Sequence, residues 1–391
     1  MSGRLLLLTL AVGAFSSAAA QDTTMVQGGI YQRPFIASAG RTAIGGYAEG
    51  NLNYFVTDGV GEGVSMELRR FNIFLFSSVG RRIRFISELE FEHGTEEIAL
   101  ETALVDFEIN PSLVLRAGIL LPPIGAFNVN HDSPRYDFVE RPLVSTRIIP
   151  ATLSEIGFGV HGRLAPGRLS LSYDAYLTNG LGDGVLLNAG GRTDLAAGKS
   201  EERFGEDNNG SPAFTGRVAA QDRRLGEIGL SFYGGIYNNW KIEGLAVDEK
   251  RWLSLIALDV GTDVGPVSLR AEAAAARVDV PFDLTELFAE RQWGFHLDAV
   301  LPIWRPRIRA LTDPVVSAVL RIEHVDLNRG RFRSTELPIG DETTAITGGL
   351  SFRPAGGTVF RANYRWESSR DLLRNPAART AGFQVGFATY F

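Results

Sequence analysis

The sequence of 391 residues contains no cysteine. Disulfide bridges, thiolate metal sites and a lipid anchor on an N-terminal cysteine are therefore excluded. Lysine is also scarce, since only three of the 39 basic residues are lysines, at positions 199, 241 and 250. The formal net charge is −6, and no basic cluster offers the electrostatic footprint that nucleic acid requires.

Long apolar runs are missing as well. The run Leu5–Phe15 follows a single basic residue and precedes three small residues, Ala18 to Ala20. It is shorter than the roughly 20 residues that a membrane helix needs, and the pattern is typical of a cleaved secretory signal. We therefore predict a signal peptide over residues 1–20. Residues 21–42 lack alternation, and we predict that they form a lead-in that lies in the periplasm or inside a lumen.

The rest of the chain alternates between apolar and polar residues. In the last twelve residues, Phe383, Val385 and Phe387 fall on one face, and small or polar residues such as Gln384 fall on the other. Residues 82–93 alternate most sharply, with Ile83, Phe85, Leu89 and Phe91 opposite Glu88, Glu90 and Glu92. Three carboxylates facing lipid would each cost a few kcal/mol, so they must face water.

This alternation predicts an all-β fold, a transmembrane antiparallel barrel over residues 43–391 with about sixteen strands. The strands are expected at 43–57, 65–79, 82–93, 98–109, 113–119, 155–164, 168–178, 214–221, 225–237, 251–261, 267–278, 292–301, 315–326, 343–353, 358–367 and 380–391. Connections after even strands are short, except after the twelfth, and those after odd strands are longer and polar, beginning with the link DGVGEG. Short periplasmic turns and longer external loops account for this asymmetry.

Side-chain parity then assigns charged residues to the lumen. The predicted pore-lining residues are Arg70, Arg84, Glu88, Glu90, Glu92, Asp106, Arg116, Arg217, Arg270, Glu272, Arg361 and Arg365. Neither sign of charge dominates the wall. The connection 120–154 contains five prolines and several apolar residues that need a packing surface, which favours a loop that enters and constricts the pore over a surface cap. Its candidate constriction residues are Arg135, Arg141, Arg147, Asp132 and Glu140.

Two stretches resemble known families. The block LRAGILLPPIGAFNVNHDSPRYDFVERPLVSTRIIPATLSEIGFGVHG, with LRRFNIFLFSSVG and ELEFEHG before it, resembles the phosphate- and polyphosphate-selective outer-membrane porins over residues 68–162. That resemblance implies a sixteen-stranded homotrimeric channel. The terminal strand resembles those of bacterial outer-membrane barrels, which implies an outer-membrane location and contact of Phe391 with the barrel-assembly machinery. The family's lysine cluster has no counterpart before residue 199, so selectivity for phosphate stays open.

Catalytic and metal-binding patterns are weak. None of the five histidines has a serine at a matching strand depth, and no HxH or HExxH spacing occurs. We therefore predict no enzyme activity, no cofactor and no metal. The favoured function is a passive diffusion porin for small hydrophilic or ionic solutes, with anions such as phosphate among the candidates. The alternative is a plugged structural or adhesive barrel that acts through external loops, above all residues 179–212.

Overall fold

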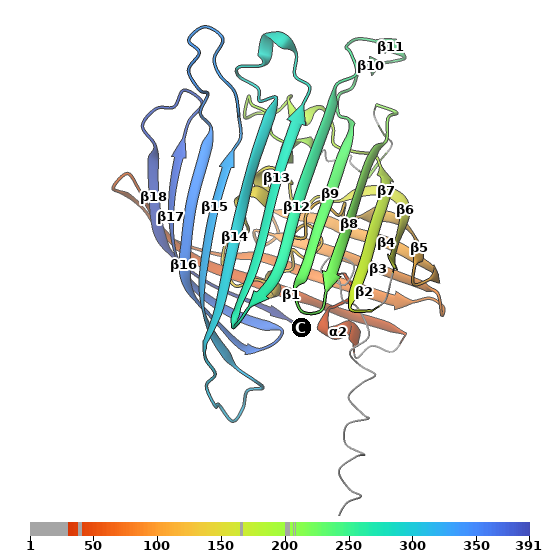
Figure 1. Cartoon of the computed structure of the whole chain (residues 1–391), viewed down its shortest axis with the longest axis vertical. Coiled ribbons are helices and arrows are strands. Elements are labelled where there is room, and N and C mark those ends of the chain that lie inside the picture. The colour runs from red at the N-terminus through yellow and green to blue at the C-terminus, as the bar shows by residue number, and fades with distance from the viewer. Residues whose placement is uncertain (1–29, 38–40, 165–166, 200–203, 206, 208) are drawn as a thin grey trace, which may run out of the picture.

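The computed structural model describes residues 30–37, 41–164, 167–199, 204–205, 207 and 209–391. The predicted signal peptide lies outside the described residues. The described chain is dominated by one closed ring of sixteen antiparallel strands (Figure 1), in which the first strand pairs with the last. The predicted barrel and its strand number are thus confirmed. No described helix is both long and apolar enough to cross a membrane.

The ring strands lie close to the predicted ranges. They are β1 (Thr42–Thr57), β2 (Val60–Ser78), β3 (Ile83–Glu92), β4 (Glu97–Asn110), β5 (Leu113–Leu120), β6 (Glu155–Leu164), β7 (Leu169–Thr178), β8 (Ala213–Asp222), β9 (Gly226–Ile236), β12 (Trp252–Val264), β13 (Val267–Val278), β14 (Arg291–Trp304), β15 (Val315–Asp326), β16 (Glu342–Ala355), β17 (Thr358–Arg370) and β18 (Ala378–Tyr390). The hairpin β10 (Lys241–Ile242) and β11 (Leu245–Ala246) stands apart from the ring. The short helices are α2 (Pro34–Ala37), α3 (Leu143–Arg147), η1 (Ser133–Arg135), η2 (Asp183–Val185), η3 (Ala196–Gly198) and η4 (Phe282–Leu284).

Alternation along each strand separates an apolar outer face from a polar inner face. In β18, Phe383 and Val385 point outward and are 62% and 52% exposed, whereas Gln384 between them is 1% exposed. Because the ring is closed, each of its sixteen described strands has a neighbour on both edges, so none of these strands leaves an open row of backbone N–H and C=O groups. The closure extends to the last residue, since Phe391 and Gly46 exchange two backbone hydrogen bonds of 3.0 and 3.1 Å.

The two ends of the barrel differ. At the end marked in Figure 1 by the C terminus and α2, described connections such as 111–112 and 356–357 are tight turns, and 305–314 between β14 and β15 is the long exception that was predicted. We call this the turn end. The opposite end, marked by β10 and β11, carries the longer connections, and we call it the loop end.

The first connection at the loop end was predicted wrongly. The stretch DGVGEG is not a loop, because β2 already begins at Val60. The chain reverses over two residues, Asp58 and Gly59, whose φ angles are 50° and 87°. Two successive positive φ angles are what a tight two-residue hairpin turn requires, and Asp-Gly is a preferred pair for it. The glycines that follow therefore continue the strand.

Candidate functional site

Residues 121–154, hereafter the inner segment, connect β5 to β6 by folding back into the lumen. The Glu272 side chain on β13 holds one part of it. One carboxylate oxygen of Glu272 accepts the backbone N–H groups of Ala126 and Phe127 at 2.8 and 3.0 Å. The other accepts the hydroxyl of Ser145 at 2.7 Å. One wall carboxylate thus satisfies three polar groups of the inner segment.

Arginines on β15, β16 and β17, close to β13 in the ring, hold the middle of the inner segment. Arg321 on β15 donates to the backbone carbonyl of Glu140 at 2.7 Å, and Arg361 on β17 donates to that of Phe138 at 2.9 Å. Arg353 on β16 pairs with the carboxylate of Asp137 at 2.9 Å. These wall side chains satisfy backbone groups that would otherwise be buried without partners. Because Glu140 also pairs with Arg69 of β2, the inner segment is held by strands far apart in the ring.

The apolar residues of the inner segment pack on the wall and on the next connection. Val144, Ile148 and Leu153 are buried in one cluster with wall residues of β12 and β13, such as Leu255 and Ala274. Leu181, Val185 and Leu195 from the connection 179–212 complete this cluster. Apolar burial thus fixes residues 144–153 of the inner segment against β12 and β13.

Arg33, just before α2, lies inside the barrel. Its guanidinium donates two hydrogen bonds to Asp132 of the inner segment, at 2.9 and 3.0 Å, and one to Glu88 of β3 at 3.0 Å. All three side chains are at most 2% exposed, and the guanidinium stacks on the ring of Phe74. The described part of the predicted lead-in is thus tied to both the wall and the inner segment.

The same place gathers possible metal ligands. Within the described residues, Glu88, His131 and Asp132 bring ligand atoms within 4.8 Å of one another. The Arg33 guanidinium already bonds both carboxylates, and the Tyr390 hydroxyl donates to Asp132 at 2.7 Å. The positive charge that these carboxylates require is therefore supplied by the chain itself, and the arrangement indicates a structural cluster.

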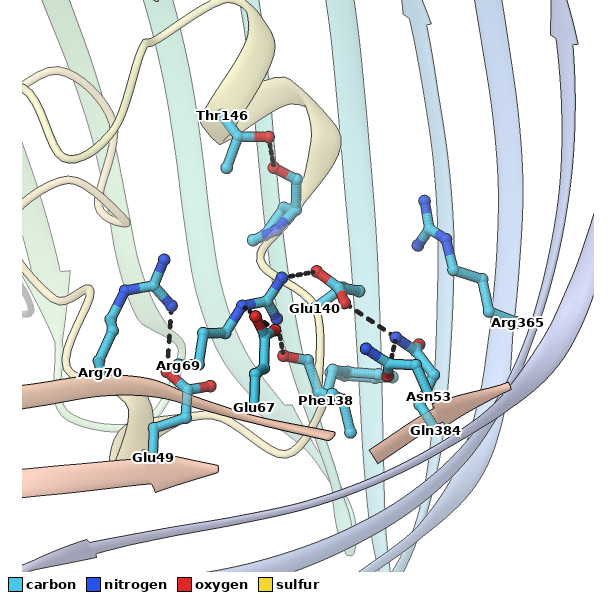
Figure 2. A network of polar contacts seen from close by, with 12 residues as sticks. Glu49, Asn53, Glu67, Arg69, Arg70, Phe138, Glu140, Thr146, Arg365 and Gln384 are labelled. Carbon is cyan, nitrogen blue, oxygen red and sulfur yellow. Dashed lines mark hydrogen bonds and ion pairs between the residues drawn. The ribbon is translucent and has the colours of Figure 1, made fainter. Parts of the chain in front are cut away.

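Two β-bulges bring extra charged residues to the lumen. In the pairing of β1 with β2, Glu49 faces Arg70 and Gly50 faces Leu68, so Arg69 is the inserted residue. Because of this insertion, Arg69 and Arg70 both point inward although they are consecutive. Arg69 pairs with Glu140 of the inner segment at 2.8 Å, as Figure 2 shows. Strict alternation would place one of the two arginines in lipid, so the predicted pore-lining residues included Arg70 but not Arg69.

The second bulge lies between β3 and β4. Glu88 faces Thr102 and Leu89 faces Leu100, so Glu101 is the inserted residue. Its side chain is 4% exposed and lies inside. The inward positions of β4 are therefore odd-numbered before the bulge and even-numbered after it. If alternation is counted back from Asp106, Glu97 and Glu101 are assigned to the outer face, although both line the lumen. The adjacent polar residues Glu101 and Thr102 indicate the bulge in the sequence.

Glu140 is the centre of the network drawn in Figure 2. It accepts hydrogen bonds from Arg69 and from the amide of Gln384, each at 2.8 Å. Burial acts to raise the pKa of the Glu140 carboxyl, but the charge of Arg69 outweighs it and holds the pKa below its ordinary value. Asp132 behaves likewise, because Arg33 and Arg135 overcome the effect of burial and hold its pKa well below the usual range. Both carboxylates are thus charged at neutral pH.

A cavity lies on each side of the inner segment. The loop-side cavity has a volume of about 480 Å³ and touches Arg141, Leu143 and residues near the loop end, such as Glu97. The turn-side cavity has a volume of about 510 Å³ and touches Pro142 and Tyr390. Since Arg141 and Pro142 are consecutive, the inner segment lies between two spaces inside one ring, each large enough for many water molecules.

Charges of both signs line each cavity. Around the loop-side cavity the basic residues are Arg69, Arg70, Arg141, Arg147, Lys199 and Arg365, and the acidic ones are Glu62, Glu90, Glu92, Glu97, Glu101, Glu140 and Glu367. Around the turn-side cavity they are Arg135, Arg270, Arg321 and Arg353 against Asp137, Glu272 and Asp298. The charges nearly balance in both spaces.

The predicted pore-lining residues fall into two groups. Those that border one of the two cavities are Arg70, Glu90, Glu92, Arg365, Arg270 and Glu272. Those that border neither are Arg84, Glu88, Asp106, Arg116, Arg217 and Arg361. Most of the second group are buried in ion pairs, such as Arg116 with Asp106 at 2.7 Å and Arg217 with Glu227 at 2.9 Å. Inward parity alone cannot distinguish a wall charge that meets water from one that meets a buried partner.

The predicted constriction residues divide in the same way. Arg141, Arg147 and Glu140 border the loop-side cavity, and Arg135 borders the turn-side cavity. Asp132 borders neither, because it is enclosed by Arg33 and Tyr390.

Known proteins resemble this chain mainly in structure. No family model matches the sequence. A protein of Aquifex aeolicus (strain VF5), described only as uncharacterized, is 27% identical over 363 residues, which cover 87% of this chain and 78% of that protein. The likeness over most of both chains indicates common ancestry without suggesting a function.

Several solved barrels share the fold. An anion-selective porin from Comamonas acidovorans is 14% identical, with a TM-score of 0.57 over 90% of this chain and 99% of its own. Salmonella typhi OmpF, solved in complex with daunomycin, is 10% identical, with a TM-score of 0.56 over 90% and 97%. OmpT of Vibrio cholerae in a trimer form is 10% identical, with a TM-score of 0.54 over 90% and 100%. At these identities the comparison establishes that the chain has the fold of outer-membrane porins.

Proposed function

We propose that this chain is an outer-membrane porin, a passive diffusion channel for small hydrophilic or ionic solutes. One observation carries the proposal: a closed ring with an apolar outside encloses charged cavities on both sides of a folded-in segment. A barrel of this size is wide enough for an aqueous channel, and a segment across the lumen narrows it to solute dimensions. The pore requires neither catalysis nor a cofactor.

The outer face supports a membrane location. Outward residues on neighbouring strands, such as Phe383, Val385, Tyr364 and Phe360, are more than a third exposed, and a continuous apolar band of this kind is stable only against lipid. We therefore propose that the protein resides in the bacterial outer membrane, exported by a signal peptide over residues 1–20. The backbone hydrogen bonds between Phe391 and Gly46 close the barrel at the seam of β1 and β18, and we propose that Phe391 also contacts the barrel-assembly machinery.

The balanced lining supports weak charge selectivity. Around the loop-side cavity seven carboxylates face six basic groups. A strongly anion-selective pore requires an excess of basic groups along the path, and here the arginines are largely offset by carboxylates. Phosphate is thus one candidate solute among several, and the resemblance over residues 68–162 is the argument in its favour.

We propose that Arg141, Arg147 and Glu140 of the inner segment form the constriction with Arg70, Glu90, Glu92 and Arg365 of the wall. These residues come from opposite sides of the loop-side cavity and include both signs of charge. We further propose a homotrimer, by analogy with the trimer form of Vibrio cholerae OmpT. Chemical cross-linking in native membranes, followed by electrophoresis, tests the trimer.

A plugged barrel is the second candidate. The cluster of Arg33, Asp132 and Glu88 fills the lumen beside β3 and ties the lead-in to the inner segment, as a plug would. Planar-bilayer recording of the purified mature protein separates the two functions. A channel gives stepwise ohmic currents in 1 M KCl, whereas a plugged barrel that inserts without current steps would contradict the proposal.

A further inference from the structure

Most of the acidic side chains around the loop-side cavity lie together on one part of the barrel wall. Four of its carboxylates, Glu90, Glu92, Glu97 and Glu101, belong to the neighbouring strands β3 and β4. Glu92 and Glu97 are direct cross-strand partners, where like charges oppose each other at a cost in stability. This acidic wall is therefore an arrangement that barrel stability alone does not favour.

Three of the six basic groups lie on wall strands β2 and β17, and the other three come from segments that fold in front of the acidic wall. Arg141 and Arg147 belong to the inner segment, and Lys199 belongs to the connection 179–212. Among the described residues, no direct ion pair joins Arg141 or Arg147 to these four carboxylates. Two of the four form ion pairs with Arg70, Glu92 at 2.6 Å and Glu90 at 3.4 Å. An open space of about 480 Å³ lies among these groups.

Charged groups on both sides retain unused hydrogen-bonding capacity. In the described part of the chain, Arg141 donates to the Thr152 hydroxyl at 3.3 Å, and its Nε and Nη2 atoms have no partner. On the wall, Oε2 of the 4% exposed Glu101 has no partner either. A buried polar atom without a partner is costly, so a bound solute that donates a hydrogen bond to Glu101 and accepts hydrogen bonds from Arg141 would relieve both deficits.

We propose that the loop-side cavity is a binding site for small zwitterionic solutes of the α-amino acid class. The solute carboxylate would face Arg141 and Arg147, and its ammonium group would face Glu97 and Glu101. A solute with one charge would satisfy one side only. The site rests on the proposed channel function, and it adds that zwitterions saturate the pore where neutral solutes merely diffuse.

Four probes of nearly equal size test this site: alanine, lactate, alaninamide and lactamide, which are respectively zwitterionic, anionic, cationic and neutral at pH 7. Influx of labelled alanine into proteoliposomes is measured with each as competitor. We expect half-inhibition by alanine at a concentration about tenfold lower than for lactate or alaninamide, since each omits one charge-assisted hydrogen bond. Equal inhibition by all four, or influx linear in alanine concentration, would overturn the site.

Two variants assign the contacts. Glu101→Gln should raise the half-inhibiting concentration of alanine to about that of lactate, and Arg141→Gln should raise it to about that of alaninamide. The matched controls Glu249→Gln and Arg224→Gln change exposed residues outside the cavity and should behave like the wild type. If a variant fails to assemble, the four-probe comparison on the wild type still decides.

Salt conductance of the same preparation is recorded in parallel. Conductance without alanine preference refutes the zwitterion site and leaves the channel intact. Absence of conductance refutes the channel itself, and the site with it.

Discussion

Replacing Arg33 should strongly lower the free energy of unfolding, because this side chain is the cation of two buried carboxylates. Its side chain and those of Asp132 and Glu88 are at most 2% exposed, and its guanidinium makes three hydrogen bonds of 2.9 to 3.0 Å to the two carboxylates. In Arg33→Met the packing on Phe74 is largely retained, but two carboxylates remain buried without their cation. Removal of one partner from a buried pair costs about 3 to 5 kcal/mol.

The ion pairs dominate this prediction. The stacking of the buried guanidinium on Phe74 is worth about 2 kcal/mol, less than the loss expected from the carboxylates. Arg33→Lys restores the charge without the planar fork and should recover only part of the loss. The assay is equilibrium unfolding by guanidinium chloride from lipid vesicles, with Arg41→Met as the control. Arg41 is exposed, and its side chain bonds only the Val79 carbonyl among the described residues, so its change should lie within about 0.5 kcal/mol.

The pH dependence gives an independent check. The pKa of Asp132 is held well below its ordinary value, so its contribution to stability is present above the unfolded pKa and is lost as pH falls through the folded one. In Arg33→Met, the cation that most lowers the pKa of Asp132 is removed while the carboxyl stays buried, so the pKa of Asp132 should rise. The variant then loses stability as pH increases, so the gap to the wild type should narrow from pH 7 to pH 5. A gap no larger than that of Arg41→Met, or one that widens at pH 5, would refute the reasoning.

Three further predictions follow from particular positions. Phe383→Arg places a charge near the middle of the lipid-facing side of β18 and should cost about 2 to 4 kcal/mol in the same unfolding assay; a loss below 0.5 kcal/mol would mean that this face does not meet lipid. Glu92→Gln removes one carboxylate from the loop-side cavity and should shift the bilayer reversal potential toward anions, by up to about sevenfold in the anion-to-cation permeability ratio, because an interaction of about 0.6 kcal/mol at about 7 Å in water acts with opposite sign on anions and cations. Gly118→Ala should cost at least about 2 kcal/mol, because φ is 120° and the new Cβ would lie 2.2 Å from the Ala103 carbonyl, whereas Gly80→Ala meets open space and should be nearly neutral.

Much of this fold could be read from alternation alone. Apart from the start of β2, the ring strands were predicted within a few residues of their observed ends, because outward residues such as Phe383 and Val385 must meet lipid while their neighbours must not. The exception at Asp58 and Gly59 is instructive. The Asp-Gly turn signal was present, but the glycines after it suggested a loop where the strand continues.

The interior was harder to predict because it depends on contacts between distant residues. Arg69 and Glu101 are inserted at bulges, and strict alternation places them on the wrong face. Glu88 was expected to line the water path with Glu90, yet Arg33, far away in sequence, encloses it. Parity identifies which side of the wall a residue faces, but the inner segment decides whether that residue meets water.

The absence of cysteine makes the central claim directly measurable, because single cysteines can be introduced at neighbouring positions without background. Glu92 borders the loop-side cavity, and Phe91 beside it lies on the opposite face of β3. We predict that a charged, membrane-impermeant thiol reagent modifies Glu92→Cys and lowers its bilayer current, while Phe91→Cys stays unreactive. Rapid modification of Phe91→Cys with an inert Glu92→Cys would contradict the account that lipid surrounds the apolar face and water fills the charged one.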